Sequence, residues 1–266
     1  MGIVTSFLAG LLLIYLGING YLYWFQRQIL YLPAHSLAEP RHYNMQNTEE
    51  IHIETSDGLS LKSWFKPADQ SGYYLLYLHG NAGNLGDRVE KLEDLASTGW
   101  GLLAVSYRGY GGNPGSPSEE GLYNDARAAI NFLLERGVTM DHIVIYGESL
   151  GSGVAIQMAT EHPFKALILE APYTSIINRA KELYPYIPIQ WLIKDRFESF
   201  KKISSVTVPV LIFHGYRDDV MPIHHGRRML MAANDPKEAH FFDHVGHTDF
   251  DMPLLASLMK KFVESH

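Results

Sequence analysis

Apolar residues along this 266-residue chain fall into two different patterns. The first is a single run at the start: Met1 to Gln26 has no charged side chain, and Ile3 to Phe25 is predominantly apolar. The second begins near Ile51, where short apolar runs alternate with longer segments of helical spacing. The pattern predicts a helix over residues 1–27, a linker over 28–50 and one domain over 51–266.

The domain pattern predicts an α/β fold. Two runs, Ile51–Glu54 and Leu59–Phe65, flank the turn Ser56-Asp57-Gly58 and predict an antiparallel pair. Strands and helices then alternate, which indicates a mostly parallel sheet with helices on both faces. The six further strands begin near Tyr73, Leu102, Ile143, Ala166, Val208 and His240, and the helices cover about 87–97, 119–136, 150–160 and 253–263.

The alternation breaks over residues 171–208, between the sixth and seventh expected strands. This segment is rich in aromatic, proline and aliphatic residues, among them Tyr184, Tyr186 and Trp191. One interpretation is a short cap that lines an apolar acyl pocket and faces a bilayer. The other is a pair of helices that simply pack on the sheet.

The N-terminal run has the length of a membrane span. Its 23 residues would form a helix of roughly 35 Å, and the hydrocarbon core is about 30 Å thick. Tyr21, Tyr23 and Trp24 near its end suit a membrane interface. One alternative is a signal peptide, but the run lacks a basic start and a small-residue cleavage site. Another is a helix packed on the domain. We expect a retained single-pass anchor, and Arg27 and Arg41 behind it favour a cytoplasmic domain.

The sequence Gly147-Glu148-Ser149-Leu150-Gly151 follows the apolar run that starts at Ile143 and opens a segment of helical spacing. Such a strand–turn–helix holds the nucleophilic serine in α/β-hydrolases. A serine hydroxyl needs an imidazole to take its proton and a carboxylate to orient that imidazole. The motif therefore predicts a histidine and an acid further along the chain.

Candidates for both follow in the expected order, serine, acid, histidine. Asp218 and Asp219 follow the strand that starts at Val208, and Asp218 is favoured because it lies nearer the strand end. Glu170 is an outside alternative for the acid. His247, after Gly246, is the predicted base in preference to four other histidines of this region: His224, His225, His240 and His244.

An oxyanion hole requires preorganised backbone N–H groups. In this fold one donor is the residue after the nucleophile, here Leu150, and the other follows the third strand. That strand leads into His79-Gly80-Asn81-Ala82-Gly83-Asn84, and Asn81 is the predicted second donor, with Ala82 as the alternative.

Three strings in the chain, Leu78-His79-Gly80-Asn81-Ala82-Gly83-Asn84, Tyr107-Arg108-Gly109-Tyr110-Gly111 and Tyr146-Gly147-Glu148-Ser149-Leu150-Gly151, resemble the Bem46-like branch of the α/β-hydrolases. His214-Gly215 through Asp218, and Gly246-His247, are similar to its acid and histidine loops. The branch also holds membrane-associated abhydrolase-domain proteins of eukaryotes. The resemblance implies an eight-stranded α/β-hydrolase fold and a serine hydrolase for esters or thioesters, often of acyl-bearing substrates. It also favours Asp218, since the family's acid lies three residues after the glycine.

Composition narrows the function classes. The chain has no cysteine, which excludes disulfides and cysteine nucleophiles, and its net charge of -7 disfavours nucleic-acid binding. We expect no cofactor and no metal, and a small-molecule ester, thioester or lipid as the partner. The alternatives are a non-catalytic binding or scaffold protein on the same fold and a serine peptidase.

Overall fold

The computed structural model describes residues 2–45, 47–69 and 72–266. Its main sheet has eight strands in the order β10-β9-β8-β7-β4-β6-β3-β2. The β2–β3 and β3–β6 pairs are antiparallel, and the other pairs are parallel. The strands are β2 (Glu49–Glu54), β3 (Ser60–Lys66), β4 (Tyr74–Leu78), β6 (Gly101–Val105), β7 (Ile143–Glu148), β8 (Ala166–Glu170), β9 (Val210–Gly215) and β10 (Lys237–Phe242). This is the α/β-hydrolase fold that the sequence predicts.

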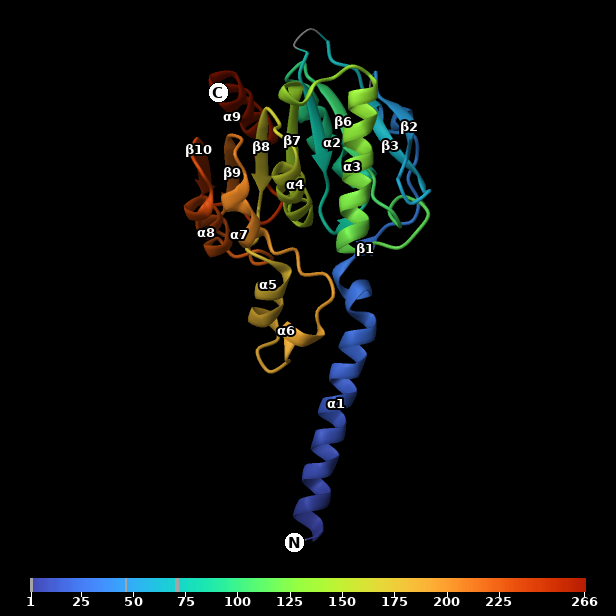
Figure 1. Cartoon of the computed structure of the whole chain (residues 1–266), viewed down its shortest axis with the longest axis vertical. Helices are drawn as coiled ribbons and strands as arrows, with labels where there is room; N and C mark the ends of the chain where they lie inside the picture. The colour runs from blue at the N-terminus through green and yellow to red at the C-terminus, as the bar shows by residue number, and fades with distance from the viewer. Residues whose placement is uncertain (1, 46, 70–71) are drawn as a thin grey trace.

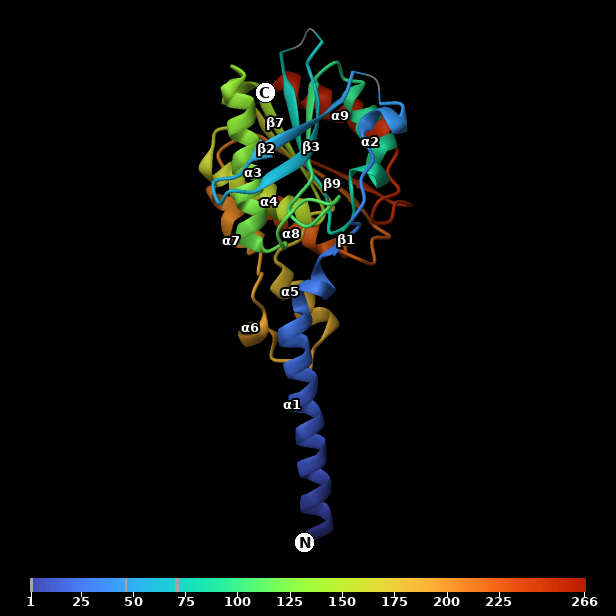
Figure 2. The ribbon, with the colours of Figure 1, turned by 90° about the vertical axis from the view of Figure 1, so that its right-hand side faces the viewer.

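Helices cover both faces of the sheet (Figures 1 and 2). One face carries α2 (Val89–Ala96) and α9 (Met252–Ser265), and the other carries α3 (Glu119–Glu135), α4 (Leu150–Glu161) and α8 (His224–Ala232). The described residues also form four short 3-10 helices: η1 (Pro40–Tyr43), η2 (Leu85–Arg88), η3 (Met140–His142) and η4 (Ile203–Ser205).

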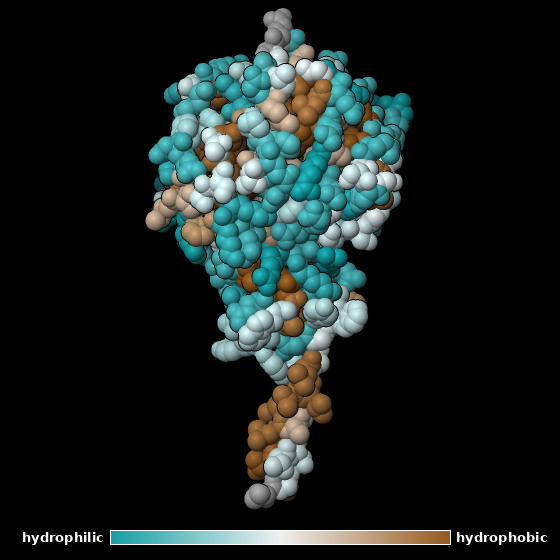
Figure 3. Space-filling model, viewed as in Figure 1, coloured by the Kyte–Doolittle hydropathy of each residue, from teal (hydrophilic) through white to brown (hydrophobic). Residues whose placement is uncertain are grey.

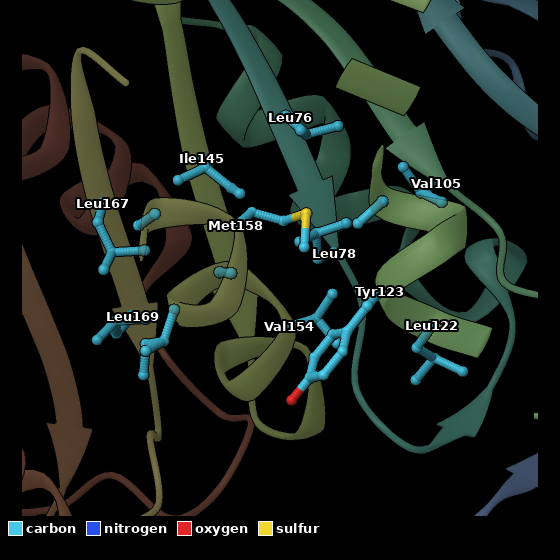
Figure 4. Packing of buried hydrophobic residues seen from close by; sticks show 14 of the residues in the cluster. Leu76, Leu78, Val105, Leu122, Tyr123, Ile145, Val154, Met158, Leu167 and Leu169 are labelled. Carbon is cyan, nitrogen blue, oxygen red and sulfur yellow. The ribbon is translucent and has the colours of Figure 1, made fainter. Parts of the chain in front are cut away.

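Alternate residues of the central strands supply two separate cores. On β4, Leu76 and Leu78 pack toward α3 and α4, whereas Leu75 and Tyr77 pack toward α2 and α9. This follows from the two-residue period of a strand, and burial on both faces explains why the strands are apolar throughout. Figure 4 shows the first core, in which Met158 of α4 lies among strand side chains.

The cap lies between β8 and β9, the sixth and seventh strands of the main sheet. It contains α5 (Ile176–Leu183), α6 (Ile189–Leu192) and α7 (Ser199–Lys202). Helices α5 and α6 lie beside α1 (Gly2–Leu30), at the end of the body from which α1 emerges (Figures 1 and 2). The other end of α1 extends well clear of the body, and its surface is mostly apolar (Figure 3).

The segment predicted as a linker, residues 28–50, contains regular structure packed on the domain in its described residues, 28–45 and 47–50. Helix α1 continues to Leu30, and β1 (Leu32–Pro33) pairs in parallel with β5 (Ala82–Gly83) in a separate two-stranded sheet. Helix α1 is therefore joined to the domain through hydrogen-bonded backbone.

Candidate active site

Ser149 lies at a sharp turn between β7 and α4, with φ 48° and ψ −113°. A positive φ is rare for a residue other than glycine and costs backbone energy, so the surrounding structure must hold it. A Cβ on Gly151 would lie 2.1 Å from the Leu78 carbonyl oxygen, and one on Gly147 would lie 2.6 Å from the Gly151 oxygen. The two glycines of the motif therefore allow the close approach of strand and helix that the turn needs.

The three residues predicted as nucleophile, base and acid meet at the carboxyl edge of the sheet. His247 Nε2 lies 2.9 Å from Ser149 Oγ, and His247 Nδ1 lies 2.8 Å from Asp218 Oδ2. These contacts fit a neutral imidazole that donates its Nδ1–H to the carboxylate and accepts from the hydroxyl at Nε2.

The two adjacent aspartates have different environments. Asp218 is buried, and its Oδ1 accepts a hydrogen bond from the Met221 N–H at 2.7 Å, whereas Asp219 is exposed. Burial alone would raise the pKa of Asp218, but hydrogen bonds from His214, His247 and Met221 N–H outweigh it and hold the pKa well below its usual range. Asp218 is therefore the ionised carboxylate that faces His247.

His214 is a contact of the acid that the sequence analysis missed. Its Nε2 lies 2.7 Å from the Met221 carbonyl oxygen and 3.3 Å from Asp218 Oδ2, and the ring is fully buried. The ring thus braces the loop that carries Asp218. Its place as the penultimate residue of the strand before that loop was the only signal in the sequence.

The other four histidine candidates have partners other than Ser149 and Asp218. His244 contacts Arg217, His240 pairs with Glu238, and both His224 and His225 pair with Glu182. His247 is thus the histidine that the fold brings to Ser149.

The two oxyanion candidates lie on segments next to the serine: Leu150 follows it in the chain, and a Cβ on Gly80, the residue before Asn81, would lie 3.5 Å from Ser149 Cβ. Leu150 is the first residue of α4, where N–H groups have no intrahelical acceptor. The other polar groups of Asn81 are held: its Nδ2 donates to the Leu30 carbonyl oxygen at 3.0 Å, and its carbonyl oxygen accepts from Leu32 N–H and Tyr110 Oη. The loop is therefore fixed by the end of α1.

A buried charge cluster lies directly beneath the serine turn. Lys91 Nζ lies 2.7 Å from both Glu148 Oε2 and Glu170 Oε1, and Tyr77 and Tyr146 each donate to one of these carboxylates. The Glu170 carboxylate is bonded to Lys91 and Tyr146 in this cluster, whereas the carboxylate that contacts His247 is that of Asp218. The Glu170 carbonyl also accepts the Ser149 N–H at 2.9 Å, so the cluster supports the turn through the backbone.

Among the described residues, Glu182, His224 and His225 form a group close enough to hold a metal ion. The hydrogen bonds oppose that use. His225 Nδ1 accepts from the Thr174 N–H, so Nε2 carries the proton that faces Glu182, and Arg179 pairs with the same carboxylate at 3.1 Å. The contacts of Glu182 with His224 and His225 instead join α5 to α8.

An apolar cavity of about 250 Å³ adjoins the site between α1 and the cap. Leu22, Ile29 and Leu30 of α1 form one wall. The cap forms the opposite wall mainly with apolar residues: Ile176, Ala180, Leu183, Tyr184, Ile187, Ile189, Leu192 and Ile193. Gln26 of α1 and the charged residues Arg179 and Asp195 also line the cavity. The cavity reaches the site at Asn81 and Met221, so one oxyanion candidate lies on its surface. The cap thus lines a pocket, whereas an acyl occupant and contact with a bilayer stay predictions.

Comparisons with known proteins agree with this architecture. Residues 71–201 match a family model described as serine aminopeptidase, S33. An uncharacterized protein of Mycobacterium tuberculosis is 37% identical over 227 residues, covering 84% of this chain and 81% of that protein. Protein bem46 of Schizosaccharomyces pombe is 33% identical over 76% of this chain and 73% of its own length.

Two further relatives extend the comparison. The lysophosphatidylserine lipase ABHD12 of Danio rerio is 30% identical over 84% of this chain and 67% of its own length. The solved structure of the Pyrococcus furiosus esterase Pf2001 superposes with a TM-score of 0.71 at 17% identity, covering 89% of this chain and 97% of that one. The latter likeness concerns the fold alone. Sequence and fold together show that this chain is a hydrolase and belongs to the Bem46-like branch of the α/β-hydrolases.

Proposed function

We propose that this chain is a membrane-anchored serine hydrolase that cleaves carboxylic ester or thioester bonds of an acyl-bearing substrate. The observation that carries the proposal is the hydrogen-bonded series from Ser149 Oγ through the His247 ring to Asp218, which starts at a strained serine on a tight turn.

The proposed reaction follows from these contacts. Ser149 Oγ attacks the substrate carbonyl carbon as His247 Nε2 takes its proton, and Asp218 stabilises the imidazolium that forms. The negative oxygen accepts from the N–H groups of Leu150 and Asn81. His247 then returns the proton to the leaving group, and an acyl-enzyme remains. Water, deprotonated by His247, attacks that ester and releases the acid.

The cavity supports an acyl group as the recognised part of the substrate. It is lined predominantly by aliphatic side chains, and such walls suit a hydrocarbon chain better than a peptide. The name of the ABHD12 relative, a lysophosphatidylserine lipase, agrees with an ester of a fatty acid. These observations favour ester or thioester cleavage over the peptidase that the description of the family model suggests.

A fluorophosphonate probe tests the nucleophile. The full chain in detergent should be labelled and should hydrolyse p-nitrophenyl esters, and Ser149→Ala should lose both properties because the attacking oxygen is gone. Ser152→Ala is the matched control: this serine lies one helical turn away but is fully buried, so labelling should persist. A folded wild-type protein that is neither labelled nor active would favour the non-catalytic binding protein.

Helix α1 supports the anchoring part of the proposal. Among the described residues it is the one candidate span, and nearly all of it is exposed, unlike a core helix. Its end is also bonded to the domain through Asn81 and through an ion pair, Arg27 Nε to Asp195 Oδ2 at 2.7 Å, as expected for a helix that is retained. The cytoplasmic orientation of the domain stays a prediction.

Extraction with alkaline carbonate tests the anchor. The full chain should remain in the membrane pellet, and Leu12→Arg with Leu13→Arg should release it, because each arginine costs about 2.5–3.5 kcal/mol at the centre of a span. Both leucines are exposed, so the domain should fold in either case. Leu12→Val with Leu13→Val is the control that should stay in the pellet. Release of the wild-type chain, or removal of its first 25 or so residues in cells, would contradict the anchor.

A further inference from the structure

We propose that residues 184–192, the cap tip, lie in the same membrane leaflet as the C-terminal half of α1. We further propose that the cavity between α1 and the cap takes the acyl chain of a membrane lipid directly from that leaflet. The inference rests on the proposed function, because it takes α1 as a membrane span.

The cap tip lies beside the C-terminal half of α1. Tyr15 Oη donates to the Tyr186 carbonyl oxygen at 3.0 Å, and Gln26 Nε2 donates to the Leu192 carbonyl oxygen at 3.0 Å. The cap tip is therefore beside α1 from Tyr15 to Gln26, a length of about 16 Å.

That part of α1 still belongs to the apolar run. The ten residues after Tyr15 contain no charge, and several of their large side chains remain exposed beside the cap: Leu16, Ile18, Tyr21, Trp24 and Phe25. A core of about 30 Å needs about 20 apolar residues, so the run from Ile3 spans only if these residues are included. Hydrocarbon that reaches them also reaches the cap tip.

The cap tip is also uncharged and carries exposed aromatic side chains. No charged residue occurs from Leu183 to Ile193, and two large aromatic side chains point to the exterior, with Tyr186 87% and Trp191 78% exposed. Such a cluster is unusual on a surface that faces water only, and Tyr and Trp are enriched where a protein enters a membrane.

Most backbone carbonyl groups of the cap tip accept hydrogen bonds. Irregular chain within hydrocarbon is tolerated only where its polar groups are bonded. Pro185 and Pro188 have no N–H to satisfy. Seven carbonyl groups of the cap tip accept hydrogen bonds, two of them from α1 and one from Arg196: those of Tyr184, Tyr186, Ile187, Pro188, Ile189, Gln190 and Leu192.

These features indicate that an acyl chain would enter the cavity between α1 and the cap tip. The walls of the cavity are α1 and the cap, and Asn81, which also lines it, follows Gly80, the residue whose Cβ would lie 3.5 Å from Ser149 Cβ. An acyl chain that passes between α1 and the cap would therefore bring its carbonyl toward Ser149 without leaving the apolar phase. The substrate class is a lipid whose ester or thioester lies near the membrane interface.

The absence of natural cysteine allows a direct depth measurement. Trp191→Cys carries an environment-sensitive fluorophore in the full chain, reconstituted in phosphatidylcholine liposomes with spin-labelled lipids. We expect quenching comparable to that of Leu12→Cys, within α1. Ser257→Cys, exposed on α9 away from the cap, should be unquenched. Quenching at position 12 but not at 191 would overturn the placement of the cap tip.

Activity tests the route of the substrate. Tyr186→Asp with Trp191→Asp should lower hydrolysis of a fluorescent lipid ester in liposomes by about ten-fold or more, because aspartate disfavours entry into hydrocarbon. Hydrolysis of soluble p-nitrophenyl acetate should stay within about two-fold, because both side chains are exposed. Leu254→Asp, which replaces an exposed apolar side chain on α9, should affect neither substrate.

The two substrates separate the possible failures. If the double variant hydrolyses both esters like the wild type, lateral entry is wrong and the proposed hydrolase stands. If the wild type hydrolyses neither ester, the proposed function is wrong, and with it the entry of a substrate through the cavity, while the quenching result still decides the position of the cap tip.

Discussion

Asp218→Asn lowers kcat for ester hydrolysis by about 10³- to 10⁴-fold, whereas Asp219→Asn changes it by less than about two-fold. The reason is the Asp218 carboxylate, which lies 2.8 Å from His247 Nδ1 and fixes which ring nitrogen carries the proton. An asparagine would present either an N–H to the ring or a neutral oxygen, and neither stabilises the imidazolium. Steady-state kinetics with p-nitrophenyl butyrate measures the effect.

The neighbouring variant is the matched control, since it makes the same chemical change one residue away on an exposed side chain. Circular dichroism and thermal melting of both variants should show a folded protein, because Asp218 Oδ1 also accepts from Met221 N–H and an amide oxygen can keep that bond. Equal kinetic losses in the two variants, or none in Asp218→Asn, would remove Asp218 from the proposed mechanism.

Lys91→Met is expected to cause the largest loss of stability, about 3–5 kcal/mol in the free energy of unfolding. The lysine is the cation between Glu148 and Glu170, and without it the buried Glu170 carboxylate loses its cation while Glu148 keeps only Arg88. For a domain of this size such a loss corresponds to a fall in Tm of roughly 10 °C. Lys261→Met, on an exposed position of α9, should leave Tm within about 1–2 °C.

The difference in Tm between the wild type and Lys91→Met should depend on pH. In the wild type, burial alone would raise the pKa of Glu148, but Lys91 and Arg88 hold it below its usual range. This group therefore adds stability above about pH 4.3, its unfolded pKa, and the contribution is lost as pH falls. In Lys91→Met both carboxyl pKa values rise relative to the wild type, that of Glu170 from a value that burial already raises, so the variant loses stability relative to the wild type as pH rises. The difference in Tm should be larger at pH 7 than at pH 5, and a constant difference would contradict the account.

The features predicted correctly from the sequence depend on local order. The turn around Ser149 is a strand, a tight turn and a helix within some twenty residues, and the two glycines mark it. The eight strands are short apolar runs in chain order, and their parallel arrangement follows from the helices between them. Because the carboxyl ends of parallel strands share one edge, Asn81, Asp218 and His247 are near Ser149 once the fold is known.

The features that were missed depend on contacts between distant segments. Lys91 lies on a short amphipathic helix, and nothing in that helix alone indicates that its amine reaches glutamates 57 and 79 residues away. The two-residue strand β1 is too short to show any period, so residues 28–50 were interpreted as a linker. The cavity needs α1 to meet the cap, and that contact, through Arg27 and Asp195, joins residues 168 positions apart.

The hydrogen bond from Asn81 Nδ2 to the Leu30 carbonyl oxygen has a practical consequence. Removing the apolar residues of α1 would be one way to obtain a water-soluble form for crystals or assays. A chain starting after Leu30 would keep all eight strands and the Ser149 turn, and would look intact by circular dichroism. It would nevertheless lack one wall of the cavity and one support of the Asn81 loop. Kinetic constants measured on such a shortened form would therefore describe a different active site from that of the chain with α1.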